Sequence, residues 1–345
     1  MLETPALSVI VVGRNEGDRL VRCLESVAAA TPPAALWEII YVDSASNDGS
    51  VDRAARLGAS VISVTPARPC AAAGRNAGWR AAHAATVLFL DGDTVLAPHF
   101  IPQALDEFAN PRIGVVFGNR RESNTDGSIY NRVLDLDWIL PAGPIEFCGG
   151  EALVRRQVLE AVGGYDERLI AAEDTELCAR IRAIGYTILH LDRPMVTHDL
   201  AITRFSQYWR RALRTGYAYA EVSEGIRPTD SPVWYRQARR SRFQGAVMIA
   251  IVAGAPILAV AARSLVPVLI GIGIIAVLAI RTAIHCRWKK ASLFIRLLHG
   301  LHSHIVQIPM LFGLLKYKLD RLDGRTPELI EYKDAPAPVP DSTRR

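Results

Sequence analysis

Short apolar runs alternate with helical patterns through the first 200 residues. Buried strands are predicted for residues 8–12, 38–43, 60–64, 86–91 and 113–118. Between them, apolar side chains recur at helical spacing, as at Leu20, Leu24 and Val27. This alternation predicts an α/β fold, with a parallel sheet covered by helices on both faces. Because ligands of such sheets bind at the carboxyl ends of the strands, polar residues at those ends are candidates for a functional site.

The apolar pattern changes after residue 200. Residues 203–224 predict a helix rich in aromatic and arginine side chains, and a polar linker with Pro228 and Pro232 follows it. Two apolar runs, 245–262 and 264–280, then contain no charged residue and are separated by Arg263. Each would form a helix of about 26 Å, just long enough to cross a bilayer core. We therefore predict a transmembrane hairpin; a buried helical hairpin of a soluble protein is the alternative.

Charged residues orient this hairpin. Arginines and lysines flank it on both sides, at Arg236, Arg239, Arg240 and Arg242 before it and at Arg281, Arg287, Lys289 and Lys290 after it. By the positive-inside rule both flanks are cytosolic, and the outer turn is very short. The net charge is only +5, and the basic residues stand beside apolar segments, which favours an anionic membrane surface over nucleic acid as the partner.

The remaining composition predicts a reducing compartment. The five cysteines are scattered without a C-x-x-C pair, so neither a disulfide framework nor a zinc site is expected. The chain begins almost at once with a strand, and no cleaved signal peptide is expected. The α/β part should therefore stay in the cytosol.

A third apolar stretch, 285–322, is interrupted by charged residues and predicts an amphipathic helix lying in the membrane interface, kinked at Pro309. Its histidines, His299, His302 and His304, are interpreted as interfacial polar positions, with a metal site as the alternative. The predicted organisation is an α/β domain over 1–225, a basic linker over 226–244, the hairpin over 245–281, the interfacial helix, and a flexible tail over 323–345.

Carboxylates follow two of the predicted strands. Asp91 and Asp93, in "VLFLDGDT", are one residue apart, so in extended backbone both point to the same side. Hard oxygen ligands of this kind suit Mg²⁺ or Mn²⁺, although an ordinary turn also explains the motif. Asp43 ends an earlier strand, where a carboxylate can accept a hydrogen bond from a nucleobase N–H or a ribose hydroxyl.

Two helix starts carry further polar residues. Arg75 and Asn76 lie near the start of a helix in "AAAGRNAGW", where backbone N–H groups and a guanidinium suit a diphosphate or sugar hydroxyls. Glu173 and Asp174 come just before a helix whose predicted apolar face is Leu177, Ile181 and Ile184. Acidic residues there are stabilised by the helix dipole by about 0.3–1 kcal/mol, so the residues alone favour a capping role.

Taken in order, these motifs resemble the family-2 glycosyltransferases and their GT-A fold. "SVIVVGRNEGDRLVRCLESV" is similar to the opening strand and helix, "YVDSASNDGS" to the base-binding turn and "GRNAG" to the donor-phosphate segment. "DGDT" resembles the D-x-D metal motif, and "GGYDERLIAAEDTEL" the acceptor-side segment with the catalytic base. The resemblance runs from about Leu7 to Tyr219.

The resemblance implies a role for each matching residue. Asp174 would be the catalytic base, and Asp93, joined by His198, would bind the divalent cation. The residues implied for donor binding are Asn15, Glu16, Asp43, Arg75, Asn76 and Asp91. Those implied for the acceptor or diphosphate side are Glu173, Gln207, Arg210 and Arg211.

The reaction implied is an inverting, Mg²⁺- or Mn²⁺-dependent transfer from a nucleotide-diphosphate sugar, with UDP expected over GDP. The acceptor would be a hydroxyl of a cell-surface polysaccharide or lipid-linked saccharide, at the cytosolic face of the inner membrane. Processive relatives carry Q-x-x-R-W, but here Arg211 follows Gln207 and Arg210 in place of the tryptophan. A hairpin alone is too small for a polysaccharide channel, so export would need oligomers or partner proteins.

Other functions stay open at this point. A polyprenyl-phosphate glycosyltransferase is the second candidate, although Pro98 stands alone where such relatives usually have two prolines. A nucleotidyltransferase would show a glycine-rich basic loop after the first strand, and "VVGRNEGDR" lacks it. A non-catalytic membrane scaffold would be favoured by the loss of a key carboxylate, and none is lost.

Overall fold

A computed structural model describes residues 5–30, 36–65, 70–225 and 234–325. The chain divides into two compact units. One, here called the sheet unit, comprises the described residues up to Ser123 together with Leu140–Asp199. The other, the helical unit, comprises Asn124–Ile139 and the described residues from Leu200 to Arg325. The inserted segment 124–139 therefore packs with the C-terminal helices although it lies between strands in sequence.

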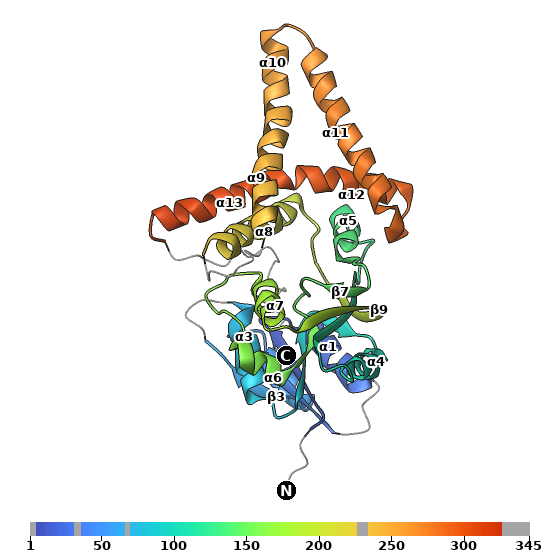
Figure 1. Ribbon diagram of the computed structural model, residues 1–345, viewed down its shortest axis with the longest axis vertical. Helices are drawn as coiled ribbons and strands as arrows, with labels where there is room; N and C mark the ends of the chain where they lie inside the picture. Colours follow the sequence, from blue (N-terminus) through green and yellow to red (C-terminus); the bar gives the residue numbers. More distant parts are fainter. Residues whose placement is uncertain (1–4, 31–35, 66–69, 226–233, 326–345) are drawn as a thin grey trace, which may run out of the picture. The chain divides into compact units, whose positions relative to one another are not determined.

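The sheet unit contains one mixed sheet, drawn from blue to green in Figure 1. Its strands are β1 (Leu7–Gly13), β2 (Trp37–Asp43), β3 (Ser60–Ser63), β4 (Thr86–Asp91), β5 (Thr94–Leu96), β6 (Ile113–Glu122), β7 (Gly143–Ile145), β8 (Ala152–Arg155) and β9 (Thr187–His198). Their order is β3-β2-β1-β4-β8-β6-β9-β5, and β7 pairs with β9. All five predicted strands are present, and the fold class is confirmed.

The sheet, predicted to be mostly parallel, contains one antiparallel strand at a central position. Strand β8 lies between β4 and β6 and runs antiparallel to both. Its first residue, Ala152, is the partner of Phe89, near the end of β4. The start of β8 therefore lies at the edge where the parallel strands end.

Helices cover this sheet. They are α1 (Asp18–Ala29), α2 (Ser50–Arg56), α3 (Ala71–Ala81), α4 (Phe100–Glu107), α6 (Arg156–Val162) and α7 (Glu173–Ala183). The predicted face of α1 is confirmed, because Leu20, Leu24 and Val27 are buried. On α7, Leu177 and Ile181 are buried, but Ile184 lies just beyond the helix and is 47% exposed. The predicted face was thus one turn too long.

The helical unit consists of α5 (Ile129–Asp135), α8 (Phe205–Gly225), α9 (Tyr235–Ile249), α10 (Ala255–Ala261), α11 (Val266–His285), α12 (Leu293–Ile305) and α13 (Gln307–Leu322). A π-helical turn, Ala250–Gly254, joins α9 to α10, and short 3₁₀ turns lie at Leu136–Trp138 and Cys286–Lys289. Two continuous helices, Tyr235–Ala261 and Val266–Lys289, are long and apolar enough to span a membrane, and form the hairpin seen in Figure 1. Only 22% and 17% of their apolar windows are buried, which does not support the buried hairpin of a soluble protein.

Two boundaries differ from those predicted. Helix α9 begins at Tyr235, so Arg236 to Arg242 form the start of the first apolar helix and not a linker; residues 226–233 lie outside the described residues. The interfacial stretch is two helices that meet at Val306, with Cys286–Lys289 forming a separate turn before them. The break lies three residues before the predicted kink, because Pro309 has no N–H to bond the Ile305 carbonyl.

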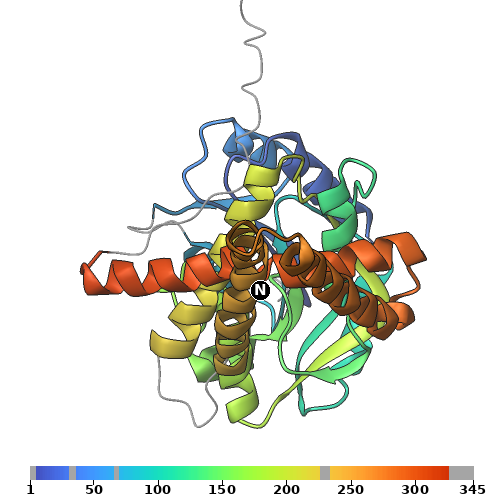
Figure 2. The same cartoon turned by 90° about the horizontal axis from the view of Figure 1, so that it is seen from above.

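Glycines allow the helices of this unit to pack at backbone distance. A Cβ atom at Gly313 of α13 would lie 2.0 Å from the Leu213 carbonyl oxygen of α8. A Cβ at Gly216 of α8 would lie 2.0 Å from the Met310 carbonyl oxygen of α13. Any side chain at either glycine would therefore push α8 and α13 apart. Figure 2 shows α12 and α13 as one nearly continuous line beneath the hairpin.

Candidate functional site

The predicted site residues of the first strands converge because of strand register. In β1, Gly13 pairs with Asp43 of β2, and Val12 pairs with Asp91 of β4. All three strands are parallel, so their carboxyl ends share one edge of the sheet. The structure therefore brings Asp43 and Asp91 to opposite sides of the end of β1, at the sheet edge where functional residues were expected.

The loops after β1 and β2 are tied together by Asn15 and Asp43. The Asn15 N–H donates to Ser46 Oγ at 2.9 Å, and Asn15 Oδ1 accepts from the Asn47 N–H at 2.8 Å. Asp43 is 2% exposed; its Oδ1 accepts from the Tyr41 hydroxyl at 3.0 Å and its Oδ2 from the Ser46 N–H at 2.9 Å. These contacts shape the turn, and direct contact with a donor stays a prediction for both residues.

The "DGD" bend lies directly against the loop after β1. The Gly92 N–H donates to the Val12 carbonyl oxygen at 2.8 Å, and a Cβ at Gly92 would lie 3.0 Å from Glu16 Cγ. Only glycine fits this approach without displacing Glu16. The bend continues into β5, whose Thr94 pairs with His198 of β9, and this pairing places His198 Nε2 3.4 Å from Asp93 Oδ2.

Arg75 links the two acidic segments of the site. Its Nη2 donates to Asp91 Oδ1 at 2.7 Å, and its Nη1 donates to Glu173 Oε1. The Arg75 side chain is only 3% exposed. Burial alone would lower the pKa of Arg75, but the carboxylates of Asp91 and Glu173 raise it well above its ordinary value. The arginine therefore stays charged, with both terminal nitrogens engaged by carboxylates.

Sequence reasoning missed two residues of the cluster of charged side chains at the strand ends, here called the crevice: Glu151 and Arg120. Glu151 immediately precedes β8 and is 3% exposed, and its Oε2 accepts from Arg120 Nη1 of β6 at 2.9 Å. The sequence feature that could have indicated them is the glycine pair before Glu151, Gly149 and Gly150. A Cβ at Gly150 would lie 2.3 Å from Arg75 Nη2, and one at Gly149 would lie 2.9 Å from Arg120 Nη2. The pair thus leaves room for both guanidiniums.

Negative charge exceeds positive charge in this crevice. The carboxylates are Asp91, Asp93, Glu151, Glu173 and Asp174, and the guanidiniums are those of Arg75 and Arg120. Burial raises the pKa of Asp91 to about 7; Arg75 opposes the shift, and Glu151 and Asp93 add to it. A cation bound here would offset part of this repulsion.

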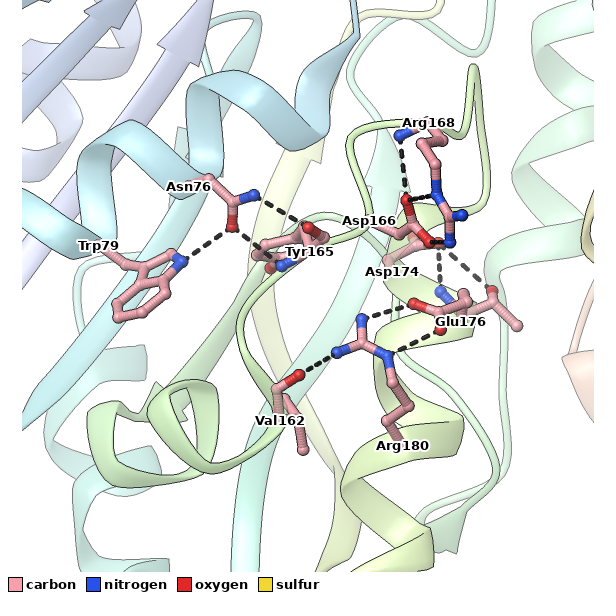
Figure 3. Close-up of polar contacts among 10 residues, drawn as sticks. Asn76, Trp79, Val162, Tyr165, Asp166, Arg168, Asp174, Glu176 and Arg180 are labelled. Atoms are coloured by element: carbon pink, nitrogen blue, oxygen red, sulfur yellow. Dashed lines mark hydrogen bonds and ion pairs between the residues drawn. The ribbon is translucent and has the colours of Figure 1, made fainter. Parts of the chain in front are cut away.

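Asp174 lies in the first turn of α7 (Figure 3), where its Oδ1 accepts from the Thr175 N–H at 2.6 Å. Burial raises the pKa of Asp174 to about 6, and the neighbouring Glu173 charge adds to the shift against the opposing effect of Arg75. The helix is anchored by Arg180, which binds both oxygens of Glu176 and the Val162 carbonyl at 2.6 Å. The predicted base is therefore a carboxylate with raised proton affinity on a fixed helix.

Asn76 holds the segment that leads to α7. Its Nδ2 donates to the Tyr165 carbonyl at 2.9 Å, and its Oδ1 accepts from the Tyr165 N–H and from Trp79 Nε1, each at 2.9 Å (Figure 3). Its Nδ2 also donates to Glu167 Oε1 at 2.7 Å, and the residue is 1% exposed. These contacts use the amide inside the protein, so its predicted donor contact gains no support from them.

The predicted acceptor-side residues do not all belong to this unit. Glu173 is bound to Arg75, as described above. Gln207, Arg210 and Arg211 lie on α8 of the helical unit. Gln207 Oε1 accepts from the Thr203 N–H at 2.9 Å and the Arg204 N–H at 3.0 Å, so this side chain caps the start of α8. Contact of these residues with an acceptor or diphosphate stays a prediction.

The histidines of the interfacial stretch have protein partners in the helical unit. His299 Nε2 and His302 Nε2 lie 3.0 and 3.3 Å from the two carboxylate oxygens of Asp137, whereas His304 Nε2 lies 3.1 Å from Thr282 Oγ1. They do not share one centre. Among the residues that the structure describes, one group of metal-ligating side chains gathers its ligand atoms within 4.8 Å of one another: Asp91, Glu151 and His198.

Comparisons with known proteins identify the fold and the family of this chain. The model of glycosyl transferase family 2 matches residues 8–163, and that of glycosyl transferase family group 2 matches residues 86–299. The solved mannosyltransferase PcManGT of Pyrobaculum calidifontis, in complex with GDP-Man and Mn²⁺, has a TM-score of 0.67 at 21% identity over 93% of this chain and 89% of that chain. The fold is therefore GT-A.

The glycosyltransferase AglE of Haloferax volcanii is 24% identical over 227 residues, which cover 63% of this chain and 74% of AglE. The pre-mycofactocin glycosyltransferase of Mycobacterium tuberculosis is 29% identical over 140 residues, covering 37% of this chain but only 30% of that protein. The chain belongs to glycosyltransferase family 2, and it is a glycosyltransferase enzyme.

Proposed function

We propose that the protein is an inverting, metal-dependent glycosyltransferase. It moves a sugar from a nucleotide-diphosphate sugar to a hydroxyl of a cell-surface polysaccharide or lipid-linked saccharide. The observation that carries this proposal is the Arg75 bridge, which ties Asp91 at the end of β4 to Glu173, the neighbour of Asp174. Predicted donor-side and base-side carboxylates therefore belong to one ion-pair network.

Asp174 supplies the base. A pKa of about 6 leaves its carboxylate mostly ionised at neutral pH and gives it a higher proton affinity than an ordinary aspartate. The Thr175 N–H fixes Oδ1, and the second oxygen accepts the proton of the acceptor hydroxyl. The hydroxyl oxygen forms its bond to the anomeric carbon as the bond to the donor phosphate breaks. One displacement of this kind inverts the anomeric centre.

The crevice fits a divalent cation. Asp93 offers carboxylate oxygens and His198 an imidazole nitrogen 3.4 Å away, and the surrounding carboxylates outnumber the guanidiniums. These are ligand types that Mg²⁺ or Mn²⁺ accepts. A cation bound there would stabilise the negative charge of the departing nucleotide diphosphate. On the nucleoside side, Asn15, Glu16 and Asp43 would contact the base and ribose.

The helical unit supports a location at the membrane. Its two apolar helices could span a bilayer, and arginines and lysines flank them on both sides. We propose that the hairpin inserts in the cytoplasmic membrane with both flanks in the cytosol, and that α12 and α13 lie in the interface. The α/β domain, 1–225, would then act on the cytosolic face; the predicted tail, 323–345, lies outside the described residues from 326 onward.

Donor turnover tests the proposal directly. The full chain, purified in detergent, is incubated with a panel of nucleotide sugars and Mg²⁺ or Mn²⁺, and the released nucleotide diphosphate is measured. Asp174→Asn should lower turnover by about 10²–10⁴-fold with unchanged nucleotide binding, because the amide cannot accept the proton. Asp106→Asn, an exposed residue of α4, is the matched control and should leave turnover unchanged.

Two results would contradict this function. Wild-type turnover in Asp174→Asn would remove the base assignment while leaving sugar transfer intact. Failure of the wild-type chain to bind or turn over any nucleotide sugar of the panel would remove the proposed donor class.

A further inference from the structure

Glu151 is a buried carboxylate with one oxygen unused. The side chain is 3% exposed, and its Oε2 accepts from Arg120 at 2.9 Å. Its Oε1 is buried and has no hydrogen-bond partner among the described residues. Leaving a buried carboxylate oxygen without a partner is unfavourable, so Glu151 in this position indicates a missing partner.

The neighbours of Glu151 are residues that commonly bind metal ions. Ligand atoms of Glu151, Asp91 and His198 all lie within 4.8 Å of one another. An octahedral cation with ligands at about 2.1 Å holds its ligand atoms roughly 3 to 4.2 Å apart. A small contraction would therefore bring the three side chains into one coordination shell. Two carboxylates and an imidazole form a ligand set suited to Mn²⁺.

Each carboxylate of this group is oriented by its own arginine. Arg75 engages Oδ1 of Asp91, and Arg120 engages Oε2 of Glu151, so the second oxygen of each remains for a ligand. Gly150 keeps this arrangement open, because a Cβ there would meet Arg75 Nη2 at 2.3 Å and Asp91 Oδ2 at 3.4 Å. Groups that orient a metal ligand in this way commonly matter for affinity as much as the ligand itself.

We propose that Glu151 is a ligand of a divalent cation shared with Asp91 and His198, and that Arg120 is its positioning residue. The inference deepens the proposed function and rests on it, because it names a residue that holds the cation of the same crevice. Asp93, 3.4 Å from His198, lies beside this group. The competing interpretation is that Glu151 serves only as the counter-ion of Arg120.

Mn²⁺ binding separates the two interpretations without any sugar donor. The full chain in detergent is titrated with Mn²⁺, and the free ion is followed by electron paramagnetic resonance. Glu151→Gln should weaken Mn²⁺ binding by about tenfold or more, because the amide carries no charge. Glu176→Gln is the matched control: it removes a buried glutamate that is paired with an arginine, Arg180, but lies outside the group, and it should change the affinity by less than about threefold.

Arg120→Gln tests the positioning role in the same titration. It should weaken Mn²⁺ binding by about tenfold while leaving turnover recoverable at saturating Mn²⁺.

If Glu151→Gln does not fold, as judged by its melting transition, Glu151→Asp replaces it. The shorter carboxylate keeps the charge for Arg120 but withdraws the oxygen, so weaker Mn²⁺ binding is again expected.

The inference is overturned if the Glu151 variant that folds binds Mn²⁺ as tightly as the wild type, or if the wild-type chain binds no Mn²⁺. Full turnover after chelation of all metal would also overturn it while leaving sugar transfer intact. A chain that binds Mn²⁺ through Glu151 but turns over no nucleotide sugar would leave the inference standing and remove the proposed function.

Discussion

Replacing Gly150 by alanine tests the tightest packing in the crevice. The new methyl carbon would lie 2.3 Å from Arg75 Nη2, where non-bonded atoms normally stay about 3.5 Å apart. The guanidinium must therefore move by about 1 Å, which disturbs its contacts with Asp91, at 2.7 Å, and with Glu173. Because Arg75 is 3% exposed, water cannot replace these partners.

The cost follows from the loss of this buried ion-pair network. Separating a buried pair costs about 3–5 kcal/mol, and we take the lower end because 30% of the Asp91 side chain is exposed. At about 2–4 °C per kcal/mol for a unit of this size, the melting midpoint of the sheet unit should fall by about 6–12 °C. Donor turnover should fall as well, because Asp91 loses the arginine that opposes its protonation.

Differential scanning fluorimetry of the purified chain measures the midpoint, and Gly74→Ala provides the control. Gly74 stands beside Arg75 on α3, but its Cβ would meet Val12 Cγ1 at an ordinary 3.5 Å. This change should be neutral or stabilise by up to about 1 kcal/mol. A Gly150→Ala midpoint within about 3 °C of the wild type would refute the reasoning, since the guanidinium would then move at little cost.

Three further outcomes are expected. Because burial raises the pKa of Asp174 to about 6, kcat/KM measured against pH should fall about tenfold per unit below pH 6, and a plateau reaching pH 4.5 would exclude this group as the base. Asn76→Ala leaves the Tyr165 N–H without its acceptor, so urea unfolding should show a loss of about 3 kcal/mol; an unchanged midpoint would contradict its internal role. Gly313→Ala should lower the yield of monodisperse protein in size-exclusion chromatography, because its Cβ would lie 2.0 Å from an α8 carbonyl oxygen. Gly273→Ala, with nothing within 4 Å, should not, and equal losses in both would argue against the close crossing.

The strands and the apolar hairpin could be predicted from the sequence because their signals are local. Runs such as 8–12 and 86–91 are apolar on both faces, which a strand buried in an α/β sheet requires. The position of Asp43 and Asp91 at strand ends then placed both in one crevice, since parallel neighbours end at the same edge. The D-x-D segment and the family could also be predicted from the sequence, because their motifs are short and local.

The tertiary structure alone decided what lies opposite these residues. Strand β8 is four residues long and inserts antiparallel between β4 and β6, and no local pattern encodes that pairing. This insertion brings Glu151 to the strand ends, where its partner Arg120 comes from β6. The same long-range packing turned Asn76 inward to Tyr165 and placed Arg75 between two carboxylates.

Sequence therefore determined which segments fold as strands, which apolar helices could enter a membrane, and which strand ends carry acidic groups. Only the tertiary structure decided which carboxylate faces which guanidinium and how much water reaches them. The physical reason is that hydrophobic periodicity is set by residues a few positions apart. The proton affinity of Asp174 and the unused oxygen of Glu151 instead depend on burial and on charges that distant parts of the chain contribute.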